Sequence, residues 1–342
     1  MHKKKYNIAV VGATGLVGET MLDILAEREF PVDKLVPLAS ERSLGKTITF
    51  CGQEYAVVEL ESFDFSDIDI AFFSAGASVS RVHAIRAASQ GAVVIDNTSE
   101  FRMQDDIPLV VPEVNPEDIA LYKKCNIIAN PNCSTIQMLV ALKPIHDEYE
   151  IKRINVATYQ ATSGAGRGYM EALESGSRNM LSGGLIQKID NEEHPISFNV
   201  VPKIDVLQPN GYTKEEMKMV FETKKMLHSE SIAVNPTCVR VPVFFGHSEA
   251  IHLETAIEPD VSRVIEILSN APGVRVTDGV SPGDYPTPLY DAAGKDEVFV
   301  GRIRKDITIK NGLNLWVVSD NIRKGAALNS IQIAEHLINQ YL

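Results

Sequence analysis

The sequence predicts an α/β protein of two domains, in which a doubly wound parallel sheet is followed by an α+β domain with a mixed sheet. Three observations predict this class. The chain has 342 residues, about the length of two domains. Short β-branched runs alternate with helix-periodic segments in the first third, as they do in parallel sheets. After about residue 150 the strands become longer and the helices less regularly spaced, which favours an α+β domain.

The first region contains the elements of the parallel sheet. Buried strands are expected at Tyr6–Val11, Leu35–Ala39, Ile68–Phe73, Ala92–Ile95 and Ile127–Ala129. A glycine-punctuated turn spans Gly12–Gly18, and apolar residues at helical spacing continue from Leu16 to Leu25. A second helix is expected over Val79–Gln90. Strands that alternate with helices in this way predict a doubly wound sheet.

The second region predicts the mixed sheet. Strands are expected at Ile154–Ala161, Thr237–Phe245, Ala250–Ile257 and Leu315–Ser319, and helices at Tyr169–Leu181, Thr213–His228 and Val261–Ser269. The Pro- and Gly-rich segment Gly279–Gly294 is expected to form an ordered loop. The last segment, Gly325–Leu342, has the pattern of an amphipathic helix, and we expect it to pack on the first domain. We place the first domain at residues 1–131 and the second at 132–324.

The composition excludes several classes of protein. Lys and Arg number 33 and Asp and Glu 45, which gives a net charge of −12. Nucleic acids and anionic membranes attract basic surfaces, so neither is expected as a partner. We expect no signal peptide, and no apolar stretch is long enough to span a membrane. Four cysteines without a CxxC pair predict no metal site and no disulfide framework, and therefore reduced thiols in the cytoplasm.

The turn Gly12–Gly18 joins a strand to a helix, which favours a Rossmann-type dinucleotide site over a purely structural turn. Its glycines permit close approach of a pyrophosphate to the free N–H groups of the helix start. At the end of the second strand, where the cofactor ribose is read, the chain has Ser40-Glu41-Arg42-Ser43. Ser40 replaces the acid typical of NAD sites, and Arg42 with Ser43 would suit a 2′-phosphate. These residues favour NADP, the alternative being that Arg42 is a solvated loop charge.

Cys133 is the candidate nucleophile. It lies in Asn130-Pro131-Asn132-Cys133-Ser134-Thr135, directly before an apolar helix-like run. A helix start stabilises a thiolate, and the thiolate is the nucleophilic form of cysteine. The other three cysteines, Cys51, Cys125 and Cys238, have no such context and are interpreted as inert.

A thiolate site needs an acid/base partner, and His247 is the candidate. It follows Gly246 after an apolar run, although a satisfied surface histidine would look the same. Arg240 lies seven residues earlier, on the opposite pleat unless a bulge or the Gly246 turn intervenes. Spacing alone therefore leaves open whether the two converge. The segment Tyr159–Arg167 runs into a glycine turn that would suit a cofactor or an ordinary hairpin exit.

Seven motifs along nearly the whole chain resemble those of bacterial aspartate-β-semialdehyde dehydrogenases. They are GATGLVG from Gly12, DNTSEFR from Asp96, NPNCST from Asn130, YQATSGAGR from Tyr159, EEMK from Glu215, CVRVPVFFGHSE from Cys238 and SDNIRKGAALN from Ser319. The resemblance implies that Cys133 is the nucleophile, that His247 is the acid/base catalyst and that Gln160 orients the substrate. Arg240 would bind the substrate α-carboxylate as a bidentate pair.

The resemblance also implies binding roles for several charged and polar residues. Glu215 would receive the substrate amino group, and Arg102 and Lys218, with Asn132, would bind the acyl phosphate or inorganic phosphate. Without the family pattern, Glu215 and Lys218 would be interpreted as a solvated helical ion pair. The residues expected to contact NADP are Gly12, Thr14, Gly15, Leu16, Val17, Ser40, Arg42, Ser43, Ser74, Ala75, Gly76, Ser163, Gly164 and Asn321.

The implied reaction is NADP-dependent reductive dephosphorylation of L-aspartyl 4-phosphate to L-aspartate 4-semialdehyde through a cysteine thioester. Inorganic phosphate is the co-substrate of the reverse direction, and the product feeds lysine, diaminopimelate, threonine and methionine biosynthesis. The resemblance also implies a homodimer formed through the second domain. One rival is an N-acetyl-glutamyl-phosphate reductase, whose blocked amine has no use for Glu215. Another is an inactive NADP-binding sensor, which would have no need of Cys133 and His247.

Overall fold

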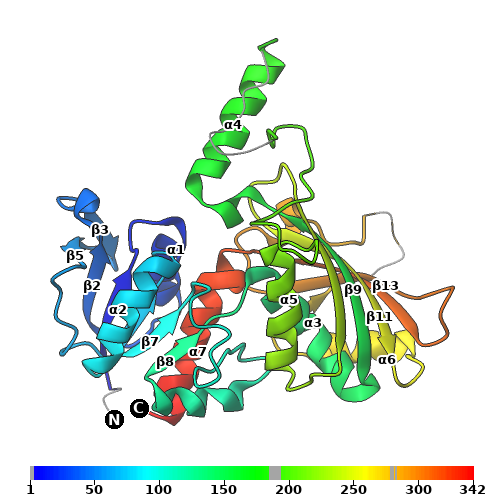
Figure 1. The fold of residues 1–342 in the computed structure, drawn as a ribbon, viewed down its shortest axis with the longest axis horizontal. Coiled ribbons are helices and arrows are strands. Elements are labelled where there is room, and N and C mark those ends of the chain that lie inside the picture. The colour runs from blue at the N-terminus through cyan, green and yellow to red at the C-terminus, as the bar shows by residue number, and fades with distance from the viewer. Residues whose placement is uncertain (1–3, 185–193, 278–280, 282) are drawn as a thin grey trace. The chain divides into compact units, whose positions relative to one another are not determined.

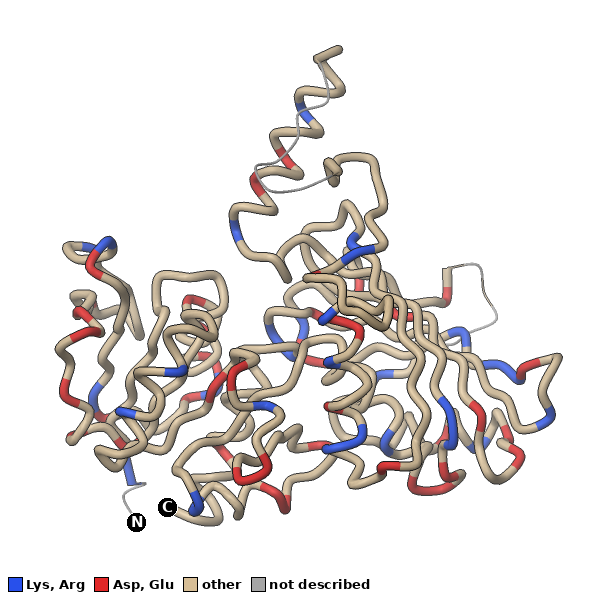
Figure 2. The backbone as a smooth tube through the Cα atoms, in the orientation of Figure 1, with Lys and Arg blue, Asp and Glu red and all other residues tan. Residues whose placement is uncertain are grey.

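The computed structural model describes residues 4–184, 194–277, 281 and 283–342. The chain divides into two compact units (Figure 1). Unit 1 comprises residues 1–131 with 326–342, and unit 2 comprises residues 132–325. In both units acidic and basic residues are interspersed along the backbone rather than gathered into one basic stripe (Figure 2).

Unit 1 is built on a six-stranded parallel sheet with the order β5-β2-β1-β6-β7-β8. Its strands are β1 (Tyr6–Val11), β2 (Val32–Ala39), β5 (Val58–Glu59), β6 (Ile70–Phe73), β7 (Val93–Asp96) and β8 (Ile127–Ala129). Every adjacent pair runs parallel. The predicted doubly wound sheet is confirmed. The short strand β5 and the hairpin of β3 (Thr47–Phe50) and β4 (Gln53–Ala56) were not predicted, because they are brief and polar.

The helices of unit 1 pack against its sheet, whose strands present their side chains alternately to the two faces. Helix α1 (Leu16–Glu27) and helix α7 (Leu328–Gln340) share one core with Ile70 and Phe72 of β6. Helix α2 (Ala77–Ser89) contacts β6, β7 and β8. The final helix begins three residues later than Gly325, after a π-helical turn η5 (Arg323–Ala327), and it belongs to unit 1.

Unit 2 is built on a six-stranded mixed sheet with the order β10-β9-β11-β14-β13-β12. Its strands are β9 (Ile151–Gln160), β10 (Ala233–Arg240), β11 (His247–Thr255), β12 (Val274–Val276), β13 (Val298–Lys305) and β14 (Gly312–Ser319). β9 and β10 are parallel, whereas β9, β11, β14 and β13 are successively antiparallel. The predicted α+β architecture is confirmed.

The helices of unit 2 lie against one face of that sheet (Figure 1). They are α3 (Cys133–Tyr149), α5 (Lys214–Met226) and α6 (Val261–Asn270). Helix α4 (Arg167–Leu181) is different, because only Leu173 among its residues is buried. Within the described part of the chain, no helix is long and apolar enough to cross a membrane.

Two predicted strand boundaries in unit 2 are wrong. The strand expected at Thr237–Phe245 ends at Arg240, and the strand expected at Ala250–Ile257 begins at His247. The apolar run between them is a turn, since Pro242 has no N–H for a sheet ladder and Gly246 has a φ of +88°. Part of the predicted loop Gly279–Gly294 lies outside the described residues, and its end contains a π-helical turn, η4 (Pro288–Ala292).

Candidate active site

The turn between β1 and α1 requires glycine at two positions. Gly12 has a φ of +86°, and a Cβ there would lie 2.9 Å from Ser74 Oγ and 3.1 Å from the Ala75 nitrogen. A Cβ at Gly18 would lie 2.2 Å from the Gly12 oxygen. The chain can therefore pass close to the end of β6 and start α1 with unpaired backbone N–H groups, which suits a pyrophosphate.

A pocket of about 540 Å³ opens at this turn in unit 1. Predicted cofactor residues that line it are Gly12, Thr14, Gly15, Ser40, Ser43, Ser74 and Ala75. Thr14 Oγ1 and Ser43 Oγ lie 3.3 Å apart and share a hydrogen bond, which links the glycine turn to the end of β2.

Four predicted cofactor residues of unit 1 do not line this pocket: Leu16, Val17, Arg42 and Gly76. Arg42 lies on the 3₁₀ turn η1 (Glu41–Ser43), and its side chain is exposed. The pocket also includes residues that were not predicted, namely Val11, Ala39, Glu41, Glu59, Leu60, Glu61, Val79 and His83. The sequence carried little signal for Glu59, because β5 has only two residues.

Arg102 is the predicted phosphate-binding residue of unit 1. It is buried, and its Nη2 donates to the Asn97 carbonyl at 3.0 Å. Asn97 follows β7, so Arg102 is anchored at the carboxyl end of the parallel sheet, where ligands of such sheets bind.

Cys133 is the first residue of α3, as predicted. Asn132 caps the helix, and its Oδ1 accepts hydrogen bonds from the backbone nitrogens of Ser134 and Thr135 at 3.0 and 3.3 Å. The Asn132 N–H donates to Glu222 Oε2 at 2.6 Å. The half-buried sulfur of Cys133 is therefore placed at the positive end of a firmly capped helix, which favours a negatively charged nucleophile.

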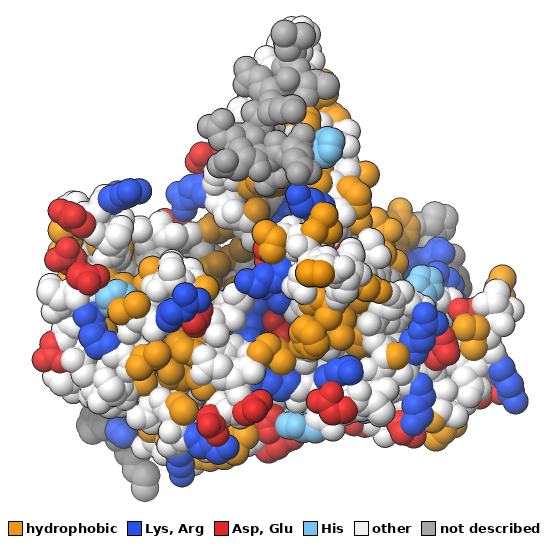
Figure 3. All heavy atoms as spheres, viewed as in Figure 1, with side chains coloured by type: hydrophobic (Ala, Val, Ile, Leu, Met, Phe, Trp, Pro, Cys, Tyr) orange, Lys and Arg blue, Asp and Glu red, His pale blue; other side chains and the backbone are white. Residues whose placement is uncertain are grey.

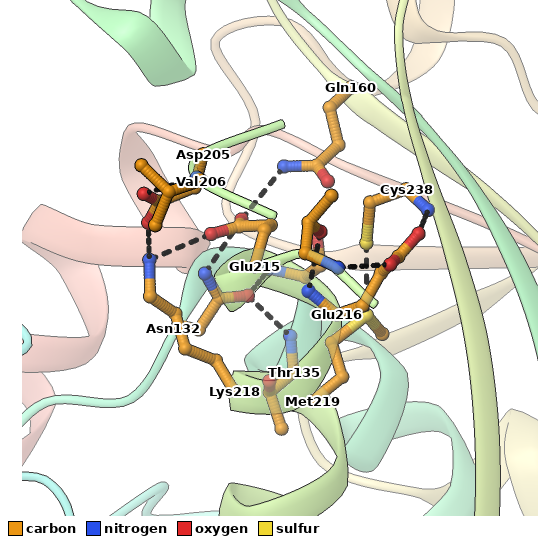
Figure 4. A network of polar contacts seen from close by, with 12 residues as sticks. Asn132, Thr135, Gln160, Asp205, Val206, Glu215, Glu216, Lys218, Met219 and Cys238 are labelled. Carbon is orange, nitrogen blue, oxygen red and sulfur yellow. Dashed lines mark hydrogen bonds and ion pairs between the residues drawn. The ribbon is translucent and has the colours of Figure 1, made fainter. Parts of the chain in front are cut away.

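Glu215 forms the centre of a network in unit 2 (Figure 4). Its Oε1 accepts hydrogen bonds from Asn132 Nδ2 at 2.9 Å and from Gln160 Nε2 at 3.1 Å. Lys218 Nζ lies 2.9 Å from Glu215 Oε2 and 3.1 Å from Asp205 Oδ2. Glu215 and Lys218 are thus part of a buried network. They are not the solvated helical ion pair that their spacing alone would suggest.

The ionisation of Glu215 follows from its partners. Burial by itself raises the pKa of this carboxyl. The Lys218 ammonium and the hydrogen bonds from Lys218, Asn132 and Gln160 outweigh burial and lower the pKa to about 2. Glu215 is therefore a carboxylate at neutral pH.

Arg240 and His247 converge on Gly164. A Cβ at Gly164 would lie 3.0 Å from Arg240 Nη1 and 3.2 Å from His247 Nε2. The turn before Gly246 brings the two side chains together, which answers the question that their seven-residue spacing left open. Arg240 Nη1 also donates to the Ala161 carbonyl at 2.7 Å.

His247 is fully buried and has a defined hydrogen-bond direction. The Ala161 N–H donates to His247 Nδ1 at 2.9 Å, so the neutral ring carries its hydrogen on Nε2. Nε2 meets no hydrogen-bond partner among the described residues. Burial is the main cause that lowers the pKa of His247 to about 3; the neighbouring Arg240 acts in the same direction and Glu215 in the opposite one.

Three predicted cofactor residues belong to unit 2, and they are Ser163, Gly164 and Asn321. Of these, Ser163 and Asn321 contact each other. Asn321 Nδ2 donates to Ser163 Oγ at 2.9 Å, and Asn321 Oδ1 accepts the Gly246 N–H at 2.9 Å. This link fixes the glycine turn that positions His247.

Three residues near the nucleophile were not predicted individually. Glu222 holds the Asn132 backbone, Asp205 shares Lys218, and a Cβ at Gly325 would lie 2.8 Å from Cys133 Cβ. Gly325 stood within a recognised motif, but its closeness to Cys133 depends on the fold. Among the described residues, no group of three or more His, Cys, Asp or Glu side chains is arranged to hold a metal ion.

A pocket at the glycine turn of a parallel sheet, and a helix-capped cysteine in the same unit as a buried histidine, are the parts of a semialdehyde dehydrogenase. Residues 7–122 match the semialdehyde dehydrogenase NAD binding domain, and residues 142–324 match the semialdehyde dehydrogenase dimerisation domain. The chain is 56% identical to an aspartate-semialdehyde dehydrogenase of a Shewanella species over 99% of both chains. It is also 56% identical to aspartate-semialdehyde dehydrogenase 2 of Vibrio cholerae, again over 99% of both. The chain therefore belongs to the aspartate-semialdehyde dehydrogenase family.

Solved structures agree with this assignment. Aspartate semialdehyde dehydrogenase II of Vibrio cholerae complexed with ASA has a TM-score of 0.97 and 55% sequence identity, covering 99% of this chain and 100% of that one. The enzyme of Candida albicans with NADP has a TM-score of 0.77 and 28% identity, covering 98% of both chains.

Proposed function

We propose that the protein converts L-aspartyl 4-phosphate and NADPH into L-aspartate 4-semialdehyde, inorganic phosphate and NADP, through a thioester on Cys133. Unit 1 would hold the dinucleotide and unit 2 the amino-acid substrate. The product would supply lysine, diaminopimelate, threonine and methionine biosynthesis in the cytoplasm. The observation that carries the proposal is a pair of opposite charges in unit 2, the cation Arg240 and the carboxylate Glu215, in the unit that presents Cys133.

These two charges suit the zwitterionic end of an α-amino acid. No described residue offers Arg240 a carboxylate, so its guanidinium can form a bidentate pair with a substrate α-carboxylate. Glu215 is ionised and can accept hydrogen bonds from a substrate ammonium group. An N-acetylated substrate has no ammonium group, which favours the aspartyl substrate over that rival.

The Cys133 thiolate would begin the reaction by attack on the acyl carbon of the substrate. The new C–S bond replaces the C–O bond to phosphate, which departs with the bonding electron pair and takes up a proton. Arg102, Lys218 and Asn132 would bind the phosphate, since they provide two cations and one amide donor. Lys218 already balances Glu215 and Asp205, so its ammonium is held in place before the substrate arrives.

When bound, NADPH supplies the hydride that reduces the thioester carbon. The oxygen then becomes an oxyanion, and His247 would hold its Nε2 hydrogen toward that oxygen. Collapse of the thiohemiacetal breaks the C–S bond, which releases the aldehyde and restores the thiolate. Gln160 would orient the acyl group, because its amide is fixed between Thr158 and Glu215.

The choice of NADP is supported by the hydroxyl groups of the nucleotide pocket. Thr14, Ser40 and Ser43 line it near the end of β2, where a 2′-phosphate would lie. The similar Candida albicans structure contains NADP. Arg42 would reach the phosphate from the adjacent 3₁₀ turn, and the carboxylates of Glu59 and Glu61 would bind ribose or adenine groups.

We further propose a homodimer formed through unit 2. Residues 142–324 match a dimerisation domain, and unit 2 exposes many large apolar side chains (Figure 3). Those more than half exposed include Leu181, Phe198, Val200, Val206, Leu207, Leu289 and Tyr290.

The test is reduction of NADP by purified protein with L-aspartate semialdehyde and inorganic phosphate. We expect turnover to require phosphate and to be faster with NADP than with NAD. The Cys133→Ala variant should show no turnover, although it should still bind NADP. Cys125→Ala is the matched control, because Cys125 is exposed and should leave the rate unchanged. Equal turnover of N-acetyl-glutamate semialdehyde, or wild-type turnover by Cys133→Ala, would contradict the proposal.

A further inference from the structure

Glu249 is a second buried glutamate of unit 2, and the reaction above does not use it. It is fully buried, and neither carboxyl oxygen accepts a hydrogen bond from the described residues. Burial raises the pKa of Glu249 well above its usual value, and the neighbouring Gln137 amide offsets only part of that rise. An isolated carboxylate in such surroundings would be very costly, because its lost hydration has no replacement.

Glu249 lies directly behind His247 on β11. Side chains alternate along a strand, so the two residues point to the same face, together with Ile251. The register places Glu249 between Thr158 of β9 and Val317 of β14. The burial pattern shows that this is the face covered by the helices. A carboxyl group thus occupies a position in the sheet that is otherwise filled by apolar side chains.

Gln137 holds the corresponding position on α3. It lies four residues after Cys133, so the two share one side of the helix. Gln137 is fully buried, and its Nε2 donates to the His247 carbonyl at 3.4 Å. Its Oε1 accepts no hydrogen bond from the described residues. Gln137 and Glu249 therefore face each other between the helix and the strand, four residues after Cys133 and two residues after His247.

We propose that Glu249 is a neutral carboxylic acid whose O–H donates to Gln137 Oε1, and that this pair positions α3 against β11 and so sets the spacing of Cys133 and His247. When Glu249 is protonated, the hydrogen-bond donors and acceptors of the carboxyl and of the Gln137 amide match. Gln137 donates to the His247 backbone and accepts from Glu249, and the carboxyl needs no cation. Glu249 is thus a positioning residue for the proposed reaction and does not touch the substrate.

The groups around Glu249 preserve its neutral form. Gln137 faces it from α3, Thr158 from β9, Val317 from β14 and Cys238 from β10. Cys238 remains a thiol, because burial raises its pKa and the carboxylates of Glu215 and Glu216 raise it further. No lysine or arginine among the described residues lowers the pKa of Glu249. Loss of the proton would therefore place an uncompensated negative charge behind the active site.

The first test compares folding stability as a function of pH in wild type and Glu249→Gln. A raised folded-state pKa stabilises the protein at low pH, and this contribution is lost as pH rises above about 4.3, the ordinary glutamate value. Glutamine cannot ionise and can still donate to Gln137. We expect the variant to gain stability relative to wild type as pH rises from about 5 to about 9. A stability difference that does not change with pH would overturn the neutral acid.

The second test concerns the spacing of Cys133 and His247 and uses turnover. Glu249→Gln should keep the wild-type kcat, whereas Glu249→Ala and Gln137→Leu should lower kcat by roughly tenfold to a hundredfold with little change in KM. Leu139→Ala is the matched control, because it removes buried volume from the same helix and leaves Gln137 and Glu249 in place. It should lower stability and leave kcat unchanged. An equal loss of kcat in Glu249→Gln and Glu249→Ala would overturn the positioning role.

This inference rests on the proposed function only for the kcat measurement. If wild-type protein fails to turn over aspartate semialdehyde, the proposed function is wrong, and the stability test still judges Glu249. An infrared band of a protonated carboxylic acid at neutral pH, present in wild type and lost in Glu249→Gln, provides a third readout. Its persistence in the variant would contradict the assignment.

Discussion

Glu215 and Glu249 are both buried glutamates of unit 2, yet their surroundings impose opposite charge states. Glu215 has three donors, from Asn132, Gln160 and Lys218, and its pKa falls to about 2. Among the described residues no cation acts on Glu249, only the Gln137 amide opposes the effect of burial, and its pKa is raised. Burial acts in the same direction on both carboxyls, so the partners decide the outcome.

The difference corresponds to two tasks in one domain. A carboxylate at Glu215 can bind the ammonium group of an amino acid and distinguish it from a blocked amine. A neutral acid at Glu249 can join a helix to a strand without adding charge behind the nucleophile. Thr158 lies between these regions, since its hydroxyl donates to Gln160 and its backbone pairs with Glu249.

The largest effect is expected from Lys218→Met, which makes Glu215 resemble Glu249. Without the ammonium, burial should raise the pKa of Glu215, and the site loses both an ionised carboxylate and a phosphate-binding cation. We expect kcat/KM for aspartate semialdehyde and phosphate to fall by at least about 10²-fold. Lys224→Met, on the same helix, is the control and should have almost no effect. A comparable loss in both variants would show that Lys218 has no special role.

A smaller effect is expected from Glu215→Gln, which removes the charge and keeps the shape. The substrate ammonium loses its ionic partner, so we expect a loss of about 10²-fold in kcat/KM, mainly through KM for the semialdehyde. KM for NADP should stay near its wild-type value, because the nucleotide pocket is in unit 1. An unchanged KM for the semialdehyde would contradict the role of Glu215 as the ammonium partner.

The smallest effect is expected on folding stability, and it follows from the ionisation of His247. The folded pKa of about 3 lies below the ordinary 6.5, so the unfolded chain binds the additional proton between these values. His247 therefore contributes stability that is complete above about pH 6.5 and is lost as pH falls toward 3. Acid titration monitored by circular dichroism should show this loss in wild type and a weaker loss in His247→Gln. Identical titrations would show that His247 is not held neutral by its surroundings.

The sequence predicted the parts of the fold that depend on periodicity and on glycine turns. The strands from Tyr6 to Ala129 and the turn at Gly12 were recognisable because alternation and glycine spacing are local properties. The ends of β10 and β11 were not, since an apolar run containing Pro242 looks like a strand until the turn at Gly246 is seen. Of the site, Cys133 and its helix cap were visible from neighbouring residues.

Other features of the site depend on contacts between distant segments. Arg240 and His247 converge on Gly164 from another segment, and one of the hydrogen bonds that keep Glu215 charged comes from Gln160 on another strand. Glu249 stood in a recognised motif, but nothing local distinguishes a buried neutral acid from a solvated carboxylate. Its environment is defined by α3 and three strands, which come together only in the folded chain.

The central claim is that Cys133 carries the acyl group in a site built for an α-amino acid, and a single-turnover experiment tests it most directly. Enzyme is mixed with NADP and L-aspartate semialdehyde without phosphate, and NADPH and the mass of the Cys133 peptide are followed. We predict a burst of one NADPH per functional site and an aspartyl adduct on Cys133, which phosphate then releases. Continuous NADPH formation without phosphate, or a burst that persists in Cys133→Ala, would contradict the account.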